Sequence, residues 1–314
     1  MTPSELRAHG RTGTALALLY VFLWSSAFVP SRVLSRMGEP LWVLTVRFAI
    51  ASVLMAVVVV ALRRPWPRTR AAWIQIAGYG LLANATYLGC TYEALRHLSS
   101  GMGAIIASTN PLLLALVAPA LLNEPLTGRK IVGLLLGFGG VLVAMSARAG
   151  TQAARPADVL LAFVGVVALV GSTLVFKRLK TAEDLLAANT VQLGTASVAL
   201  LPVAILLEGA PHFPPTAEFI LNFAYLILVM SLGATFLWFW LLRHGEASRV
   251  SAFYFLTPIF GLGLGALLLG EPVRPLDGLG LAAVAAGIVL VQSSRGRAVP
   301  AAVKETEGTG GVGV

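Results

Sequence analysis

The chain contains an internal repeat. Residues 95–143 align without a gap on residues 242–290, and 11 of these 49 positions are identical. The identities are Leu95-Arg96-His97 with Leu242-Arg243-His244, Pro111 with Pro258, Leu121-Leu122 with Leu268-Leu269, Glu124-Pro125 with Glu271-Pro272, Gly133-Leu134 with Gly280-Leu281, and Gly140 with Gly287. Because the repeat keeps its charged and turn-forming residues, it predicts two copies of one structural unit.

The composition predicts that both copies lie in a membrane. Only 12% of the residues are charged and 57% are hydrophobic, whereas about 25% of residues are charged in soluble domains. A water-soluble chain of 314 residues does not bury so much apolar surface in one core. The net charge of +9 does not indicate nucleic acid, since the basic residues are scattered at the ends of apolar segments. The single cysteine, Cys90, excludes an internal disulfide.

Ten apolar segments are long enough for spanning helices, which need about 20 residues. We expect them at residues 14–33, 41–62, 72–95, 101–122, 129–146, 157–176, 186–207, 218–242, 248–269 and 275–292. Of the 23 lysines and arginines, 16 fall in the two tails and the even-numbered loops, and 6 fall in the odd-numbered loops. Since cytoplasmic loops are rich in these residues, both termini are predicted to be cytoplasmic.

Five spans in each copy is an odd number, so the second copy enters the membrane in the opposite orientation. The predicted fold is an all-α membrane protein of ten transmembrane helices in two inverted five-helix repeats, at residues 14–146 and 157–292. Short tails at 1–13 and 293–314 flank them. Inverted repeats in a membrane are typical of secondary transporters that work by alternating access.

Each copy has a proline within its fourth span, Pro111 or Pro258, directly after a polar residue, Asn110 or Thr257. A proline removes one helical hydrogen bond and frees a carbonyl group. Transporters use broken helices at mid-membrane to bind polar substrates, so we predict substrate binding by Asn110 and Thr257. The alternative is a packing kink in which Asn110 bonds the freed carbonyl.

Other polar and aromatic residues at mid-membrane depth extend this predicted site. Asn84 and Tyr87 share one face of the third span, and Trp24 and Trp238 can stack on a substrate ring. The predicted substrate-binding residues are Trp24, Ser26, Asn84, Tyr87, Asn110, Thr173, Trp238, Tyr254 and Thr257. Serine and threonine alternatively bond their own backbone, and we interpret Asn189 and Gln192 as a contact between helices.

Two charged residues, Arg47 and Glu93, are predicted at similar membrane depth. One hypothesis is an ion pair at the interface, and the other is proton coupling by Glu93. Glu124 and Glu271, each followed by proline, are interpreted as structural, because a carboxylate there complements the dipole of the next helix. The glycines of the fifth and tenth spans are expected to pack helices closely within the chain, with a homodimer contact as the alternative.

The sequence lacks the patterns of enzymes and of ATP-driven pumps. It has no Walker phosphate loop, no zinc-ligand spacing and no nucleophile elbow. We therefore predict no enzyme activity, no cofactor and no bound metal. The predicted partners are a small-molecule substrate and the lipid bilayer, with protons as a candidate coupling ion. An exchanged solute or the substrate gradient is the alternative source of energy.

Several motifs resemble the EamA domain of the drug/metabolite transporter superfamily. They are Leu23-Trp24-Ser25-Ser26-Ala27-Phe28-Val29, Arg47-Phe48, Glu93-Ala94-Leu95, Asn110-Pro111, Asn123-Glu124-Pro125, Thr257-Pro258 and Gly270-Glu271-Pro272. The resemblance covers about residues 14–292. It implies a ten-helix carrier of the bacterial inner membrane that exports amino acids, related metabolites or small drugs. The implied cavity is lined mainly by the first, third and fourth helices of each repeat, and the last helix of each is peripheral.

Taken together, these features predict a multi-pass secondary active transporter that exports small metabolites such as amino acids through a central cavity. One alternative is a small-drug exporter of broad specificity, which requires an acidic, aromatic cavity. A second alternative is a membrane sensor or enzyme on the same scaffold. A sensor requires an attached soluble domain, and an enzyme requires a buried cluster of acids, histidines or metal ligands.

Overall fold

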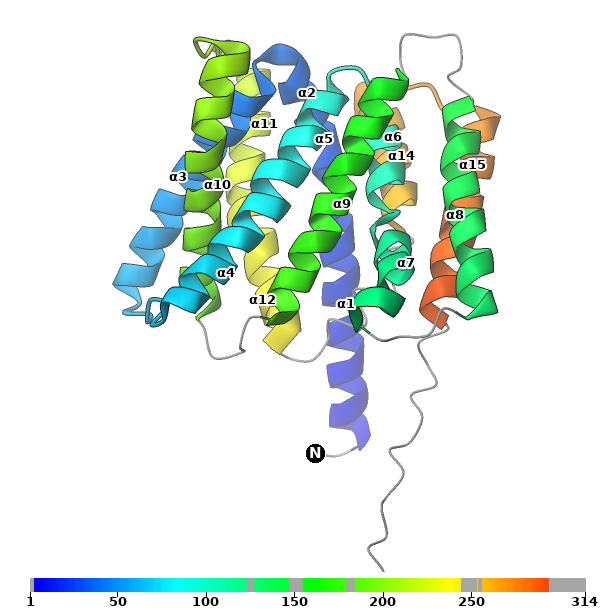
Figure 1. Ribbon diagram of the computed structural model, residues 1–314, viewed down its shortest axis with the longest axis horizontal. Helices are drawn as coiled ribbons and strands as arrows, with labels where there is room; N and C mark the ends of the chain where they lie inside the picture. The colour runs from blue at the N-terminus through cyan, green and yellow to red at the C-terminus, as the bar shows by residue number, and fades with distance from the viewer. Residues whose placement is uncertain are drawn as a thin grey trace, which may run out of the picture.

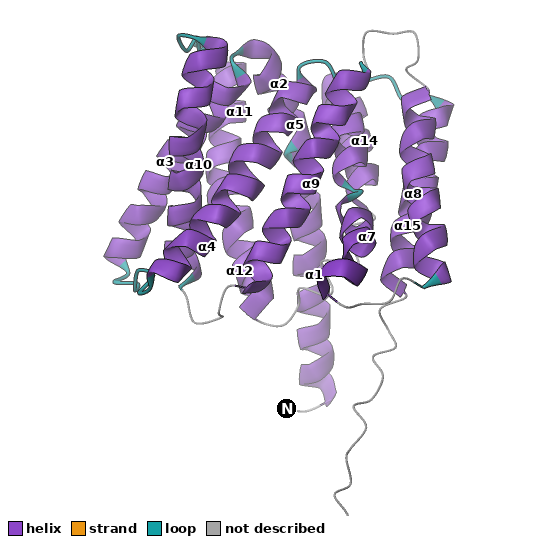
Figure 2. Cartoon of the chain, in the orientation of Figure 1, coloured by secondary structure: helices purple, strands orange, loops and turns teal. Residues whose placement is uncertain are grey.

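The computed structural model describes residues 3–122, 127–146, 155–178, 184–243, 253 and 256–293. Within these ranges every regular element is a helix and no strand is present (Figure 2). The helices stand side by side in a single bundle (Figure 1). The all-α prediction is therefore confirmed for the described part of the chain.

The helices follow one another in two series separated by residues 147–155. The first series is α1 (Pro3–Ser26), α2 (Phe28–Met37), α3 (Pro40–Ala61), α4 (Arg70–Gly80), η1 (Leu81–Thr86), α5 (Tyr87–Leu95), α6 (Ser100–Ala107), α7 (Asn110–Leu122) and α8 (Gly128–Ser146). The second is α9 (Pro156–Arg178), α10 (Leu185–Glu208), α11 (Ala217–Tyr225), η2 (Leu226–Ala234), α12 (Thr235–Arg243), α14 (Thr257–Leu269) and α15 (Pro275–Ser293). Because α1 begins at Pro3, most of the predicted N-terminal tail is helical.

Six helical segments among the described residues are long and apolar enough to cross a membrane, and shorter apolar helices accompany them. The surface of the bundle carries large apolar side chains: Leu206 is 82% exposed and Leu267 is 79% exposed. Such a surface is stable against lipid and not against water. The structure is therefore that of a multi-pass membrane protein, while the count of ten spans and the side of the termini stay predictions.

Helix starts are fixed by side chains that accept hydrogen bonds from free backbone N–H groups. Thr69 caps α4 by accepting from Ala72, and Ser99 caps α6 by accepting from Met102. Asp184 accepts from two N–H groups at the start of α10. Each cap binds backbone N–H groups of the first helical turn, which have no partner within the helix. The starts of these helices are therefore determined by residues next to them in the sequence.

Helices α3 and α10 pack through a reciprocal pair of hydrogen bonds. The Ser52 hydroxyl donates to the carbonyl of Thr190 over 3.0 Å, and the Ser197 hydroxyl donates to the carbonyl of Thr45 over 2.9 Å. Ser52 corresponds to Ser197, and Thr45 to Thr190, at one offset of 145 residues. The second hydrogen bond is thus the first one with the two helices exchanged. Two antiparallel helices related by a two-fold axis make such exchanged contacts.

Helices α8 and α15 repeat this reciprocity through glycines. A Cβ atom on Gly140 would lie 2.6 Å from the carbonyl oxygen of Gly280, and one on Gly133 would lie 2.8 Å from that of Gly287. Gly280 and Gly287 follow Gly133 and Gly140 by 147 residues, so these contacts are also exchanged. The glycines thus allow the backbones to touch within one chain, as we expected.

Two π-helical segments interrupt the third and eighth predicted spans at equivalent places. Residues 81–86 of η1, moved by the repeat offset of 147, fall on 228–233, inside η2. Each segment ends near a threonine that donates to the carbonyl five residues earlier, Thr86 to Leu81 and Thr235 to Met230. π-Helical turns occur frequently at functional sites, so both interrupted helices are candidates to contribute to a functional site.

The fourth predicted span is broken between α6 and α7, one turn before Pro111. The hydroxyls of Ser108 and Thr109 donate to the carbonyls of Ile105 and Ile106, each over 2.7 Å. Asn110 makes no such bond, and its Oδ1 atom has no hydrogen-bond partner among the described residues. At this break the hydroxyls of Ser108 and Thr109 bond carbonyl groups in the way that the alternative had assigned to Asn110.

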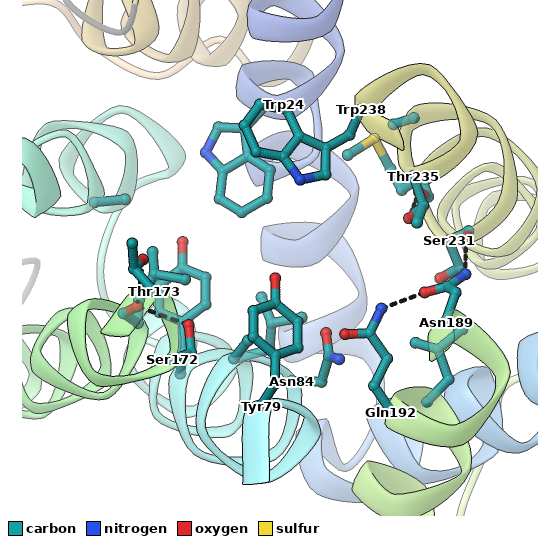
Figure 3. Close-up of a pocket in the computed structure, with 18 of the residues that line it drawn as sticks. Trp24, Tyr79, Asn84, Ser172, Thr173, Asn189, Gln192, Ser231, Thr235 and Trp238 are labelled. Carbon is teal, nitrogen blue, oxygen red and sulfur yellow. Dashed lines mark hydrogen bonds between the residues drawn. The ribbon is translucent and has the colours of Figure 1, made fainter. Parts of the chain in front are cut away.

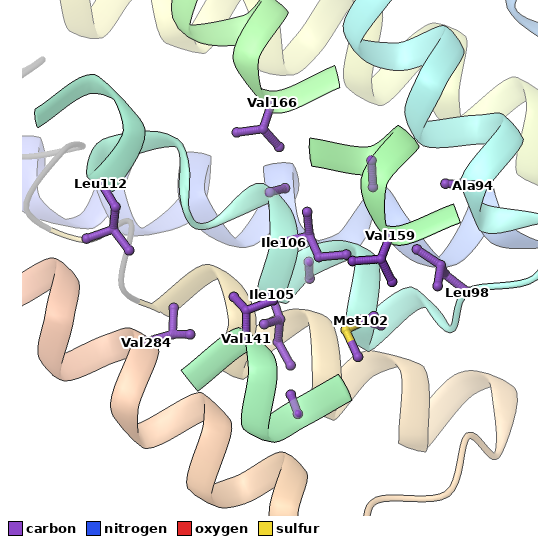
Figure 4. Close-up of a cluster of buried hydrophobic side chains, with 14 of the residues drawn as sticks. Ala94, Leu98, Met102, Ile105, Ile106, Leu112, Val141, Val159, Val166 and Val284 are labelled. Atoms are coloured by element: carbon purple, nitrogen blue, oxygen red, sulfur yellow. The ribbon is translucent and has the colours of Figure 1, made fainter. Parts of the chain in front are cut away.

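Large apolar side chains hold the bundle together outside these polar contacts. One cluster joins α5, α6, α7, α8, α9 and α15, and includes Met102, Ile105, Ile106, Val159 and Val284 (Figure 4). A second cluster joins α2, α3, α10, α11 and η2.

The glycine contacts give a direct test of the α8–α15 interface. Gly140→Ala should destabilise the protein by about 1–3 kcal/mol, since the added methyl group forces the two backbones apart. Gly139→Ala is the matched control, because a Cβ there meets nothing within 4 Å and alanine favours helix. Thermal unfolding of the purified protein in detergent measures both. Equal melting temperatures for the two variants would contradict the close packing.

Candidate functional site

A central cavity of about 190 Å³ lies between the helices of the two series. Its lining comes from α1, α3, α9, α10, α14 and from the segmented helices α4–η1–α5, α6–α7 and η2–α12, and none of the described lining residues belongs to α8 or α15. The described polar and aromatic lining residues are Tyr20, Trp24, Arg47, Phe48, Tyr79, Asn84, Tyr87, Ser108, Asn110, Ser172, Thr173, Asn189, Gln192, Ser231, Thr235, Trp238 and Thr257. The second predicted span of each repeat, α3 or α10, therefore contributes as well, which the resemblance did not imply.

The structure brings most of the predicted binding residues together. The cavity is lined by Arg47 and by seven of the predicted substrate-binding residues: Trp24, Asn84, Tyr87, Asn110, Thr173, Trp238 and Thr257. Ser26 does not line it, because its hydroxyl donates to the carbonyl of Leu23 and bonds the hydroxyl of Tyr225. Tyr254 lies outside the described residues.

Three buried polar atoms at the cavity have no hydrogen-bond partner among the described residues. They are Nδ2 of Asn84, Oδ1 of Asn110 and Oγ1 of Thr257. Burying an unpaired polar group costs about 1–3 kcal/mol, and inside a bilayer no lipid atom compensates for it. Three such groups around one cavity leave hydrogen-bonding capacity unused there.

One wall of the cavity is aromatic. The rings of Tyr20 and Trp238 stack with centroids 5.1 Å apart, and those of Trp24 and Tyr87 stack at 6.3 Å. Tyr20 and Trp24 lie 6.4 Å apart and join the two pairs. Trp24 and Trp238 lie on one side of the cavity, and Asn84 and Gln192 lie across from them (Figure 3). The cavity thus presents an apolar face and a polar face.

The polar face contains a network on α10 and η2. The Asn189 amide donates to the carbonyl of Ser231 over 3.3 Å and accepts from the Gln192 amide. Asn189 therefore joins two helices, as we predicted, and both amides also line the cavity. Ser172 and Thr173 bond the carbonyl of Leu169 on their own helix, so their hydroxyls are less available to a solute than the three unpaired groups.

The expected pair between Arg47 and Glu93 is wrong. Arg47 donates to the hydroxyls of Ser231 and Tyr92, whereas Glu93 pairs with Arg96 at 3.4 Å and is 37% exposed. Tyr92 and Glu93 are neighbours on a helix and point in directions about 100° apart. Glu93 consequently faces away from Arg47 and does not line the cavity, which leaves the proton-coupling hypothesis for Glu93 without structural support.

Sequence reasoning did not identify Tyr20, Tyr79, Ser108 and Ser231 as lining residues. Tyr20 precedes the candidate Trp24 by four residues and so shares its helix face. This spacing was the signal available in the sequence. Ser231 lies within the π-helical segment η2, and Tyr79 and Ser108 lie beside η1 and the broken helix, where a regular spacing does not predict the direction of a side chain.

At one end of the bundle, two carboxylates accept hydrogen bonds from helix N-termini. Glu271 accepts from the backbone N–H and the hydroxyl of Ser100, each at 2.8 Å, and lies 3.8 Å from Arg32. Glu208 accepts from the N–H groups of Leu41 and Trp42 at the start of α3. Glu271 therefore stabilises the start of α6 and not, as expected, that of the helix after it. Glu124 lies outside the described residues.

Comparison with protein families gives a match over nearly the whole chain. The EamA-like transporter family matches twice, at residues 11–146 and at residues 157–293. A protein of Archaeoglobus fulgidus, named as an uncharacterized transporter, is 30% identical over 89% of this chain and 98% of its own length.

Two bacterial relatives carry more specific names. A Salmonella typhimurium protein named as a probable amino-acid metabolite efflux pump is 24% identical over 88% of this chain and 93% of its own length. An Escherichia coli K12 protein named as an uncharacterized inner membrane transporter is 24% identical over 88% and 89%. A crystal structure with 19% identity superposes with a TM-score of 0.62 over 89% of this chain and 96% of that one, which shows a shared fold.

The unpaired hydroxyl at the cavity gives a stability test. Thr257→Val keeps the shape and removes an unpaired buried polar atom, so we expect the variant to unfold at the same or a higher temperature. Thr109→Val is the control, since it removes a hydroxyl that does have a partner, the carbonyl of Ile106, and should cost about 0.5–1.5 kcal/mol. If Thr257→Val were the more destabilised of the two, Thr257 would have a structural partner.

Proposed function

The chain belongs to the EamA-like transporter family, and we propose that it is a secondary transporter that exports small metabolites such as amino acids through its central cavity. As a family member, it carries a small-molecule substrate across a lipid bilayer and is not an enzyme. It is a multi-pass protein of the inner membrane, like the relatives named for that location. The substrate, the direction and the mechanism are the parts that we propose.

The observation that carries the proposal is the set of unpaired atoms at the cavity. Asn84 offers a donor, Asn110 an acceptor and Thr257 a hydroxyl. Asn110 and Thr257 precede the two equivalent prolines, so the two halves contribute matching positions. In a transporter these positions bind a polar solute midway across the membrane. A purely structural kink gives no reason for three unpaired groups to meet at one cavity.

The two faces of the cavity favour an amphipathic metabolite. The stacked rings of Tyr20, Trp24 and Trp238 offer apolar area, and the amides of Asn84 and Gln192 lie opposite (Figure 3). An amino acid with an apolar side chain has both kinds of surface. The relative named as an amino-acid metabolite efflux pump supports the same substrate class and the direction of export. A cationic drug is disfavoured, since no described lining residue is acidic.

We further propose that residues 14–146 and 157–292 form two inverted five-helix repeats, ten spans in all, with cytoplasmic termini. The exchanged contacts at α3–α10 and α8–α15 support this arrangement, because a two-fold axis between antiparallel helices generates contacts of this kind. In this proposal the two halves rock about that axis and expose the cavity to each side of the membrane in turn.

Uptake into proteoliposomes tests the function. We expect one pool of radiolabelled amino acids to accumulate, and Asn110→Leu to reduce the rate about tenfold, since the variant removes one hydrogen bond to a charged group of the substrate. Asn222→Leu is the control, because that amide bonds the carbonyl of Glu218 on its own helix, away from the cavity.

Two results would contradict the proposal. If the folded wild-type protein moved no amino acid pool, amino acids would be excluded as the substrate class. If Asn110→Leu and Asn222→Leu had equal rates, the cavity would not be the binding site. Retention of the wild-type elution volume in size-exclusion chromatography shows that each variant is folded.

A further inference from the structure

Arg47 is a buried cation in the middle of the bundle. Its side chain belongs to α3, and the residue is only 6% exposed. Its Nε atom donates to the hydroxyl of Ser231 over 3.2 Å, and Nη1 donates to the hydroxyl of Tyr92 over 2.9 Å. The guanidinium carbon also lies 5.4 Å from the ring centroid of Phe48. These contacts fix the orientation of the group but none of them neutralises its charge.

No carboxylate of the described residues compensates Arg47. The ion pairs within 4.0 Å among these residues join other partners, such as Arg32 with Glu271 and Arg96 with Glu93. The described lining of the cavity contains Arg47 as its only charged residue. An arginine stays protonated in proteins, and a buried charge without a counter-ion is costly. The site therefore lacks one negative charge.

The position of Arg47 makes its guanidinium accessible to a solute. Arg47 lines the central cavity and also a smaller chamber of about 60 Å³, and Trp24 and Tyr87 line both as well. With Nε and Nη1 bonded to hydroxyls, Nη2 makes no hydrogen bond to the described residues. One nitrogen of a fixed, planar donor group is thus available where the two chambers meet.

We propose that the substrate carries a carboxylate, and that Arg47 binds it. This inference rests on the proposed function and names the chemical class of its substrate: a small amphipathic carboxylate. The carboxylate accepts from the guanidinium, which supplies the missing negative charge. The apolar part of the solute lies against Tyr20, Trp24 and Trp238, and its remaining polar groups bond Asn84, Asn110 and Thr257.

Direct binding to the purified protein tests this proposal without any need for transport. The probes are phenylacetate and phenylacetamide at pH 7.5, which share one shape and differ in charge. Because Trp24 and Trp238 lie in the cavity, intrinsic tryptophan fluorescence reports the titration. We expect phenylacetate to bind about ten- to a hundredfold more tightly than the amide, as a charge-assisted hydrogen bond predicts.

Variants of Arg47 test whether this residue causes the preference for phenylacetate over phenylacetamide. Arg47→Gln should bind both probes equally, and Arg47→Lys should keep part of the preference, because lysine retains the charge without the planar donor group. Arg68→Gln is the matched control: it removes the same charge from an exposed loop and should keep the full preference. Elution volume and melting temperature identify any variant that is not folded.

Three results would overturn the proposal: no saturable binding of phenylacetate to the wild-type protein, equal binding of the two probes, or a preference that persists in folded Arg47→Gln. If Arg47→Gln is unfolded, Arg47→Lys decides: an unchanged preference with lysine overturns the role of the guanidinium, and a reduced one supports it. Uptake of amino acids is measured separately, so the proposed transport function and the role of Arg47 can fail independently.

Discussion

The structure depends on the cost of polar groups inside a bilayer, where no water pairs with them. Many buried polar side chains here bond a backbone carbonyl, as Ser25 bonds Val21 and Thr45 bonds Leu41. Five buried side-chain atoms have no hydrogen-bond partner among the described residues; three of them, in Asn84, Asn110 and Thr257, lie at the central cavity, and the other two belong to Ser35 and Asp158. Since an unpaired polar group is costly inside a bilayer, three of them at one cavity mark it as the candidate site.

The exchanged contacts link this site to a mechanism. Ser52 and Ser197 cross-link α3 and α10 twice in the same way, and the glycines of α8 and α15 do likewise. Both pairs of contacts join one half of the chain to the other, and each contact has a counterpart in which the two halves are exchanged. In our proposal, rocking of the two halves therefore exposes the cavity to each side in turn.

The sequence predicted the class of fold and seven of the residues that line the cavity, but not the directions of side chains. Membrane depth follows from helical rise, so Asn110, Thr257 and Trp24 were found from their positions. Direction about the helix axis depends on packing. Arg47 therefore bonds Tyr92 and not its neighbour Glu93, and the π-helical turns beside Tyr79 and Thr235 alter the spacing on which a sequence argument relies.

The central claim is that the cavity opens in turn to both sides of the membrane. The most direct measurement is labelling of Thr235→Cys, at the cavity wall, by a membrane-impermeant maleimide in sealed vesicles of either orientation. A Cys90→Ser background removes the only native thiol. Our account predicts labelling from both sides, with a ratio that an amino acid substrate or an imposed pH gradient changes. Labelling from one side alone under every condition would mean a blind pocket and would contradict transport through the cavity.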